Sequence, residues 1–102
     1  MHIDIEATNI ELTPPLREYV EEKIGKLSKF LTRFESDSVH VKVEVARLTR
    51  HHRHGNVYHA EANLHFPGGM LRAEYQSEDI RVSIDRVKKI LQREIRKYKA
   101  TH

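Results

Sequence analysis

The chain has 102 residues, a formal net charge of +3 and no cysteine. This length fits one small domain with a single core, and the absence of cysteine excludes disulfides and thiolate metal ligands. The shares of charged (32%) and hydrophobic (38%) residues are typical of a folded domain rather than a disordered tail. No apolar stretch approaches the roughly 20 residues of a membrane span, and no basic start followed by an apolar run indicates a signal peptide. We therefore predict a cytoplasmic protein without a membrane partner.

The first third of the chain predicts a strand followed by a helix. Residues 2–8 alternate between apolar and polar side chains, which is the pattern of a half-buried strand. Thr13 followed by two prolines indicates a helix start, because threonine can cap the first turn and proline is tolerated there. Apolar residues then recur at helical spacing, which predicts a helix over about residues 14–33. Gly25 lies inside it, at a cost of about 1 kcal/mol relative to alanine.

The middle of the chain predicts three more strands, over about residues 38–47, 56–66 and 70–76. Each shows the alternation of apolar and polar side chains that a half-buried strand requires. Gly55-Asn56 and Pro67-Gly68-Gly69 are turn signals between them. Short connections predict an antiparallel meander, and the first strand–helix–strand unit is long enough for a right-handed parallel crossover.

The last quarter of the chain predicts a second helix, over about residues 78–99. Ser77 is its expected N-cap, and Glu78 and Asp79 favour the positive end of the helix dipole. Apolar residues at steps of three and four form one stripe, which consists of Ile84, Val87, Leu91, Ile95 and Tyr98.

These elements together predict an α+β domain with the order β-α-β-β-β-α. Two helices packed on one face of a four-stranded mixed sheet bury every apolar strand face and helix stripe at once. The other face of the sheet is expected to meet water. Its side chains would be His2, Asp4, Glu6, His40, Lys42, Glu44, His59, Glu61 and His65.

Lysine and arginine are concentrated on the two predicted helices. Residues 86–99 contain seven of them and one acid, so this segment carries +6 and the rest of the chain −3. If the helices lie side by side, the clusters merge into one patch that contacts phosphates with little base specificity. We predict a polyanion binder, with structured RNA as the ligand; a solvated helix face is the alternative. The predicted RNA-binding residues are Lys23, Lys26, Lys29, Arg33, Arg86, Lys89, Arg93, Arg96 and Lys97.

A histidine-rich segment, His51-His52-Arg53-His54, first suggests a metal site. Arg53 would place a positive charge beside the ion, and no nearby carboxylate pair completes a ligand set. We therefore predict no metal and no cofactor there, and favour a segment in solvent or against phosphates. A metal-binding protein is the third hypothesis.

No pattern in the chain indicates catalysis. Gly68-Gly69 joins two predicted strands instead of opening a helix, so it is not a phosphate-binding loop. The mere presence of serine, histidine and aspartate does not make a catalytic triad, which is defined by geometry. We predict a protein that is not an enzyme and has no small-molecule substrate.

Two long stretches carry recognisable motifs. The opening IEATNIELTPPLREYVEEKIGKLSKF contains T-P-x-[LI]-R-x-[YH]-V and K-L-x-K, and LHFPGGMLRAEYQSEDIRVSIDRVKKILQREIRKYK contains a P-x-G turn, E-D-x-x-x-x-I-D and a basic final helix. In this order and spacing they resemble the ribosome hibernation-promoting factors, also called ribosome-associated inhibitors. The likeness covers essentially all of residues 1–102.

The resemblance implies a fold related in shape to double-stranded RNA-binding domains, and an activity without chemistry. Such factors bind the small ribosomal subunit in the decoding channel, block mRNA and tRNA binding, and inhibit translation under stress or in stationary phase. The matching motifs imply rRNA contacts for Lys23, Lys26 and Lys29 and for Arg93 and Lys97. The other four predicted residues come from the charge pattern.

The chain departs from the family pattern at three places. Ile80-Arg81 stands where Met-Tyr is usual, Ile90 stands where lysine is common, and the RHHRHG segment is longer. Longer members carry a second domain through which ribosomes pair. The chain is thus a short-form factor or the N-terminal domain of a long one, and ribosome dimerisation would require that domain or a second factor. The alternative function is a double-stranded RNA-binding module that acts away from the ribosome.

Overall fold

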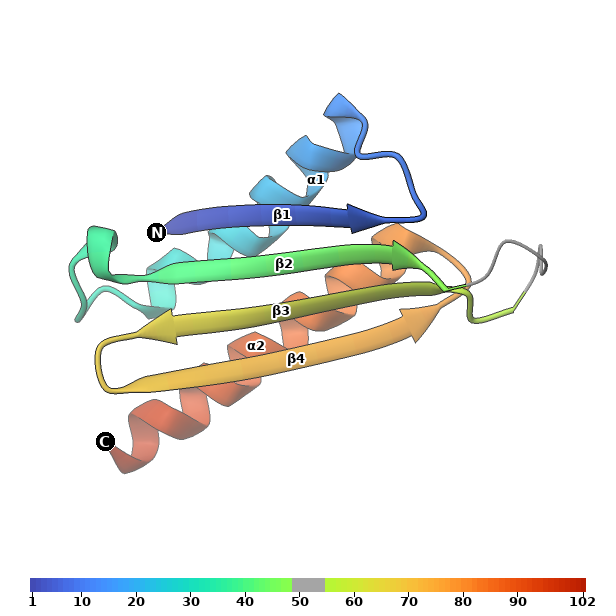
Figure 1. Ribbon diagram of the computed structural model, residues 1–102. Coiled ribbons are helices and arrows are strands. Elements are labelled where there is room, and N and C mark those ends of the chain that lie inside the picture. The colour runs from blue at the N-terminus through green and yellow to red at the C-terminus, as the bar shows by residue number, and fades with distance from the viewer. Residues whose placement is uncertain (49–54) are drawn as a thin grey trace.

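The computed structural model describes residues 1–48 and 55–102, and their elements follow the predicted order (Figure 1). The histidine-rich segment His51–His54 lies outside the described residues. Within the described ranges, no helix combines the length and the apolar character that a membrane crossing requires. The elements are β1 (His2–Thr8), α1 (Pro14–Gly25), the 3-10 helices η1 (Lys26–Phe30) and η2 (Ser36–Ser38), β2 (His40–Arg47), β3 (Tyr58–Phe66), β4 (Gly69–Ser77) and α2 (Ile80–Thr101).

The four strands form one mixed sheet in the order β1-β2-β3-β4, and both helices lie behind the same face (Figure 1). β1 pairs with β2 in parallel, whereas β2–β3 and β3–β4 are antiparallel. The parallel pair is joined through α1, as the predicted crossover requires. The predicted α+β fold class is confirmed.

The hydrophobic core lies between the sheet and the two helices. Strand residues such as Val43 and Leu64 and helix residues such as Ile24 and Leu91 are at most 1% exposed. Because side chains alternate along a strand, the same packing turns every second residue of the sheet toward the opposite, open face. One side of the sheet is therefore covered by helices and the other carries polar side chains.

The first helix is shorter than the predicted range of 14–33. Thr13 caps it as expected, with its Oγ1 accepting a hydrogen bond from the Leu16 amide at 3.3 Å. The α-helix ends at Gly25, and the chain continues as the 3-10 helix η1 to Phe30. Glycine is a poor helix former, and the α-helix gives way to the tighter 3-10 geometry directly after it. Leu27 remains fully buried, so the apolar stripe continues through the change.

The second helix begins later than predicted, and its cap is a different residue. Ser77, the expected N-cap, is the last residue of β4, and Asp79 caps α2 by accepting a hydrogen bond from the Arg81 amide at 2.8 Å. Ser77 Oγ instead lies 2.6 Å from the Asp79 carbonyl and 2.6 Å from Ser83 Oγ. Because β4 continues through Ser77, the helix starts at Ile80, two residues after the predicted start at residue 78. Ser83 also donates to the Tyr58 carbonyl at 3.0 Å, which ties the start of α2 to β3.

Candidate nucleic-acid interface

The two helices are fixed to each other by a tyrosine–aspartate hydrogen bond. Tyr19 on α1 donates its hydroxyl hydrogen to Asp85 Oδ1 on α2 at 2.7 Å. Burial, and then the adjacent carboxylate, raise the pKa of Tyr19 to about 12, because both disfavour the phenolate. The phenol therefore stays protonated at neutral pH and keeps its hydrogen for Asp85. Tyr19 was not among the residues predicted from the sequence to form this site.

The Tyr19 ring also supports one cation from each helix. The guanidinium carbon of Arg81 lies 4.6 Å from the ring centroid, and Lys23 Nζ lies 5.4 Å from it. At these distances the negative face of the ring attracts both cations. The ring thus holds positive charge at the junction of α1 and α2.

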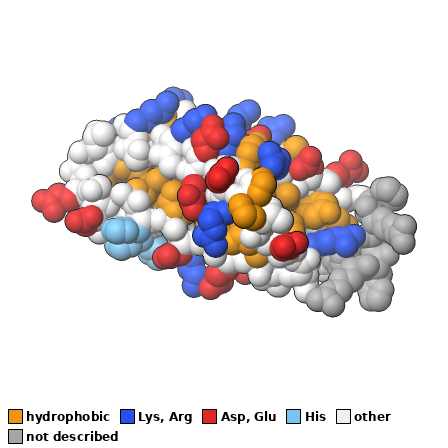
Figure 2. Space-filling view, turned by 90° about the horizontal axis from the view of Figure 1, so that it is seen from above, with side chains coloured by type: hydrophobic (Ala, Val, Ile, Leu, Met, Phe, Trp, Pro, Cys, Tyr) orange, Lys and Arg blue, Asp and Glu red, His pale blue; other side chains and the backbone are white. Residues whose placement is uncertain are grey.

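A groove runs between the helices, and its walls are cationic. Two adjoining hollows share Lys88 and Lys89, which lie at the centre of the surface. Asp85 is the one acid among the lining residues, and it is already engaged by Tyr19. Figure 2 shows Lys and Arg side chains along the upper outline, which is the helical side of the molecule. We call this surface the cationic groove; it consists of Lys23, Lys26, Lys88, Lys89, Arg93 and Arg96.

Lys88 is a groove residue that is not among the nine predicted RNA-binding residues. It is half-buried, and its Nζ donates a hydrogen bond to Gln92 Oε1 at 2.7 Å. Burial lowers the pKa of Lys88, and four neighbouring lysine charges lower it further: those of Lys29, Lys26, Lys23 and Lys89. Like charges from both helices therefore act on one amine, as expected if the two predicted clusters form a single patch. Spacing alone could not reveal this, because Lys88 becomes central only when α1 lies beside α2.

Phe30 links the far end of the groove to both helical segments. Lys29 Nζ lies 5.3 Å and the guanidinium carbon of Arg96 lies 5.6 Å from its ring centroid. Lys99 Nζ donates a hydrogen bond to the Phe30 carbonyl at 3.1 Å. These contacts bring η1 and the last turns of α2 together and extend the positive surface beyond the groove.

Three of the nine predicted residues lie outside the cationic groove. The Arg86 guanidinium is 5.8 Å from the Tyr75 ring, and Arg86 lines a further hollow on the β4 side of α2 together with Lys89 and Arg93. Lys97 follows eleven residues later on the same side of α2 and forms an ion pair with Glu94 at 3.6 Å. Arg33 lies beyond η1 and donates to the His102 carbonyl at 3.3 Å. The structure gathers the other six at or next to the groove: Lys23, Lys26, Lys29, Lys89, Arg93 and Arg96.

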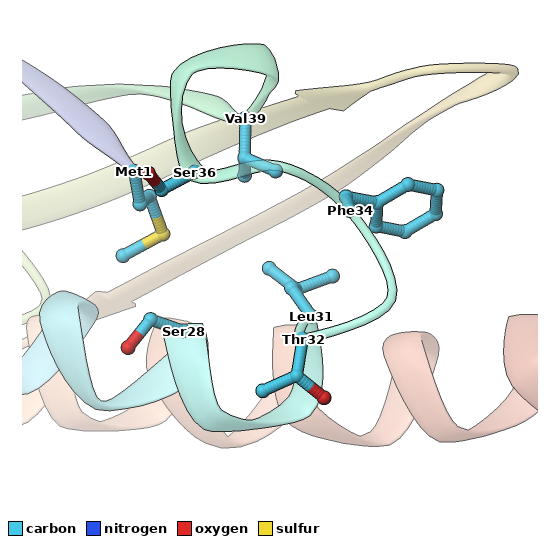
Figure 3. Close-up of a pocket in the computed structure, with 7 residues that line it drawn as sticks. All are labelled: Met1, Ser28, Leu31, Thr32, Phe34, Ser36 and Val39. Atoms are coloured by element: carbon cyan, nitrogen blue, oxygen red, sulfur yellow. The ribbon is translucent and has the colours of Figure 1, made fainter.

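A separate hollow near the start of the chain is apolar and has different chemistry (Figure 3). Met1, Leu31, Phe34 and Val39 supply most of its surface, and its polar lining is limited to serine and threonine side chains. A site for a charged ligand needs convergent charged or hydrogen-bonding groups. We therefore place the candidate interface at the cationic groove.

The chain matches one protein-family model over nearly its whole length. The model of the family described as "Sigma 54 modulation protein / S30EA ribosomal protein" matches residues 3–102.

Three similar proteins carry the name ribosome hibernation promotion, or promoting, factor. That of Klebsiella oxytoca is 31% identical over 99 residues, which cover 97% of this chain and 94% of the relative. That of Deinococcus radiodurans is 35% identical over 94 residues, and that of Lactococcus lactis is 38% identical over 96 residues. These two matches cover 92% and 94% of this chain, but 47% and 48% of the relatives. The chain thus spans about half the length of these two relatives.

Two solved structures have the same fold. The crystal structure of the Thermus thermophilus Protein Y N-terminal domain superimposes with a TM-score of 0.75 at 26% identity, covering 96% of this chain and 99% of that one. A ribosomal subunit interface protein from Coxiella burnetii superimposes with a TM-score of 0.71 at 23% identity, covering 98% and 99%. The second likeness supports the fold alone.

Proposed function

This chain belongs to the Sigma 54 modulation protein / S30EA ribosomal protein family, and from that membership we propose that it is a ribosome hibernation factor. It binds the small ribosomal subunit through the cationic groove, occupies the decoding channel and blocks mRNA and tRNA binding. Translation is thereby inhibited under stress or in stationary phase. The mechanism is occlusion without catalysis, and it acts in the cytoplasm, where the ribosomes are.

The observation that carries this proposal is the convergence of lysines from both helices on one groove. Lys23 and Lys26 come from α1 and η1, whereas Lys88 and Lys89 come from α2. Burial and then the repulsion between these cations lower the pKa of Lys88, so the crowded charges oppose folding of the free domain. Phosphate groups placed in the groove offset this repulsion and release counterions, so binding should weaken steeply with salt.

The proposed recognition depends on RNA shape and phosphate positions rather than base identity. Tyr75, with 37% exposure, is the one aromatic side chain among the exposed large hydrophobic residues of the described ranges. Sequence-specific readers of single-stranded RNA stack bases on several exposed aromatic rings. A structured rRNA channel supplies instead a fixed array of phosphates, which matches a rigid cationic groove.

Sedimentation with ribosomal particles tests the proposal directly. Purified protein is mixed with small subunits, large subunits or assembled ribosomes and separated on sucrose gradients at low and moderate salt. We expect co-migration with small subunits and assembled ribosomes that survives moderate salt and is competed by tRNA. Equal binding to isolated duplex RNA and to small subunits would contradict the proposal and support a general double-stranded RNA-binding module.

A matched pair of variants assigns the binding surface. Lys89→Glu/Arg93→Glu reverses two groove cations, whereas Arg17→Glu/Lys42→Glu makes the same charge change away from the groove. Arg17 and Lys42 are exposed and form ion pairs with Glu21 and Glu6. We expect only the groove variant to lose co-sedimentation, with both variants retaining a native circular dichroism spectrum. An equal loss in both would mean that net charge, rather than the groove, determines binding.

A further inference from the structure

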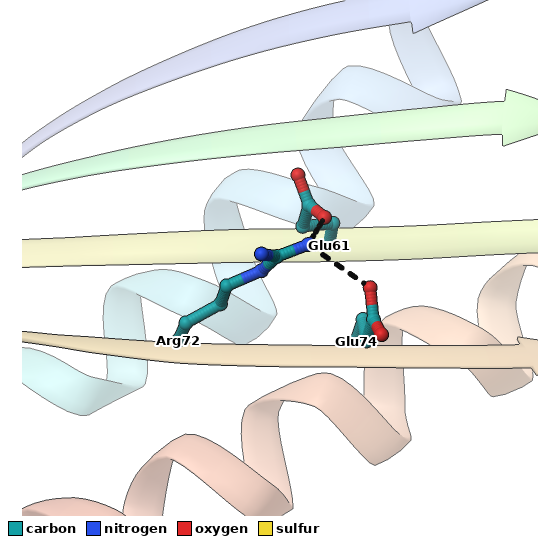
Figure 4. A network of polar contacts seen from close by, with 3 residues as sticks. All are labelled: Glu61, Arg72 and Glu74. Carbon is teal, nitrogen blue, oxygen red and sulfur yellow. Dashed lines mark hydrogen bonds and ion pairs between the residues drawn. The ribbon is translucent and has the colours of Figure 1, made fainter.

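The open face of the sheet has chemistry opposite to that of the cationic groove. Cross-strand register places four glutamates in one row from β1 to β4: Glu6, Glu44, Glu61 and Glu74. Two cations pair with this row. Lys42 lies 3.7 Å from Glu6, and Arg72 contacts both Glu61 and Glu74 (Figure 4). The acids outnumber their partners, so this face attracts cations.

A histidine lies next to the β3–β4 end of this row. His59 precedes Glu61 by two residues on β3, so both side chains are on the open face. Glu74 is the residue directly opposite Glu61 on β4. One ligand atom from each of His59, Glu61 and Glu74 lies within 4.8 Å of the other two. His59 and Glu74 also line a surface hollow beside Gln76.

The His59 ring carries a buried polar atom without a partner. Its Nδ1 is shielded from solvent and has no hydrogen-bond partner among the described residues. Buried polar atoms are nearly always paired, and an exception calls for an explanation such as a bound ion or water. This second observation, independent of the acidic row, distinguishes the His59 end from the rest of the face.

We propose that His59, Glu61 and Glu74 form a binding site for a first-row divalent metal ion, with Zn²⁺ as the best-fitting ion. One imidazole and two carboxylates are a ligand set that zinc accepts, and water completes a tetrahedral shell. Zinc–ligand bonds of about 2.1 Å require the ligand atoms to approach more closely than 4.8 Å. The Glu74 side chain is 57% exposed and free to move inward, whereas Glu61 is only 23% exposed and is held on β3.

Arg72 competes with the ion for the two carboxylates. Its hydrogen bond to Glu61, together with the charge of that carboxylate, raises the pKa of Arg72, so it remains a cation. In the metal-free protein its guanidinium neutralises Glu61 and Glu74, as Figure 4 shows. The exposed Arg72 side chain swings away when the ion binds. Arg72 therefore lowers metal affinity without being a ligand.

The proposed metal site is separate from the cationic groove. The groove lies on the helices, whereas His59, Glu61 and Glu74 are on strands and face away from the helices. Metal binding can therefore be measured without RNA, and its failure would leave the ribosome proposal intact.

Isothermal titration with zinc chloride tests the site. The protein is purified without an affinity tag and treated with chelator, and His51, His52 and His54 are replaced by alanine so that this segment cannot bind zinc. We expect one Zn²⁺ per chain, and a loss of affinity of at least about tenfold in His59→Gln and in Glu61→Gln. Arg72→Gln should bind zinc several-fold more tightly.

The matched control is His65→Gln, which removes an imidazole from the same strand and the same face but outside the ligand set. It should bind zinc like the parent protein. Glutamine at position 59 keeps a polar side chain of similar size, and a native circular dichroism spectrum excludes a folding defect. Absence of zinc binding in the parent background, or unchanged affinity in His59→Gln, would overturn the proposal.

Discussion

The two faces of the sheet use charged residues in opposite ways. On the helical side, the cations of α1, η1 and α2 converge, and the groove between them contains the single acid Asp85, which is bonded to Tyr19. On the open side, Lys42 and Arg72 each contact glutamates of the transverse row. Lysine and arginine therefore have different effects on ligand binding in the groove and on the open face. Crowded cations favour a polyanion, whereas cations surrounded by acids mainly neutralise their neighbours.

This difference also orients the proposed complex with RNA. Phosphates are attracted to the groove and repelled by the glutamate row, so the domain meets rRNA with its helices first. The net charge of only +3 conceals this separation, because the acidic and basic surfaces nearly cancel. The arrangement of charge is thus more informative than its sum.

The largest expected effect comes from reversing charge at the centre of the groove. Lys88→Glu/Lys89→Glu should weaken small-subunit binding by about 100-fold, since it removes two phosphate contacts and adds repulsion. Lys88→Arg/Lys89→Arg keeps the charge and serves as the control. Filter binding with labelled small subunits at fixed salt gives both affinities. A loss of less than threefold in the reversed variant would argue against the groove as the interface.

A smaller effect is expected from loosening the helix pair that forms the groove. Tyr19→Phe removes the hydrogen bond to Asp85 and should lower the free energy of unfolding by about 1 kcal/mol in urea. It also leaves the Asp85 carboxylate free to repel phosphates, so RNA affinity should fall as well. Tyr75→Phe, at an exposed position on β4, is the control and should change neither quantity.

The same hydrogen bond predicts an alkaline transition. The pKa of Tyr19 is raised to about 12 from the ordinary 10, so the folded state retains a proton that the unfolded state has lost. The stabilisation is complete below about pH 10 and disappears as the pH rises toward 12. Ultraviolet titration of tyrosinate should show a late step from Tyr19, and Tyr19→Phe should abolish that step. A late step that persists in Tyr19→Phe would assign the raised pKa to another tyrosine.

A modest and opposite effect on stability is expected when one groove charge is neutralised. Lys88→Met removes a crowded cation but keeps a long side chain, so the free domain should become slightly more stable while it binds RNA less well. The sign follows from the lowered pKa of Lys88, since folding disfavours its charged form at neutral pH. Urea unfolding and filter binding on the same samples would detect the two opposite changes. Destabilisation by Lys88→Met would show that its contact with Gln92 outweighs the repulsion.

The smallest effect is expected on the open face. Arg72→Ala breaks two exposed ion pairs, and solvent screens such pairs so that they contribute little to stability. The free energy of unfolding in urea should therefore change very little, and small-subunit binding should not change. A substantial loss of ribosome binding in this variant would mean that the open face also contacts the ribosome.

Local patterns in the sequence were sufficient for the architecture. The alternation of valines in residues 40–47 and the three- and four-residue spacing of Ile84, Val87 and Leu91 reflect burial on one face, which is a local property of a strand or helix. The Thr13 cap is local as well, and it was predicted correctly. The cap of α2 was wrongly assigned to Ser77, because only the sheet determines how far β4 extends.

The composition and spacing of the sequence determined the fold class, the two amphipathic helices and the concentration of cations on them. Only the tertiary structure decided which side of each helix meets the other, and therefore that Lys88 belongs to the groove whereas Lys97 does not. Strand register likewise placed His59 beside Glu61 and Glu74, although Glu61 and Glu74 are 13 positions apart along the chain. The physical reason is the same in both cases. Periodicity reports whether a side chain is buried, but its neighbours on the surface are set by packing between distant segments.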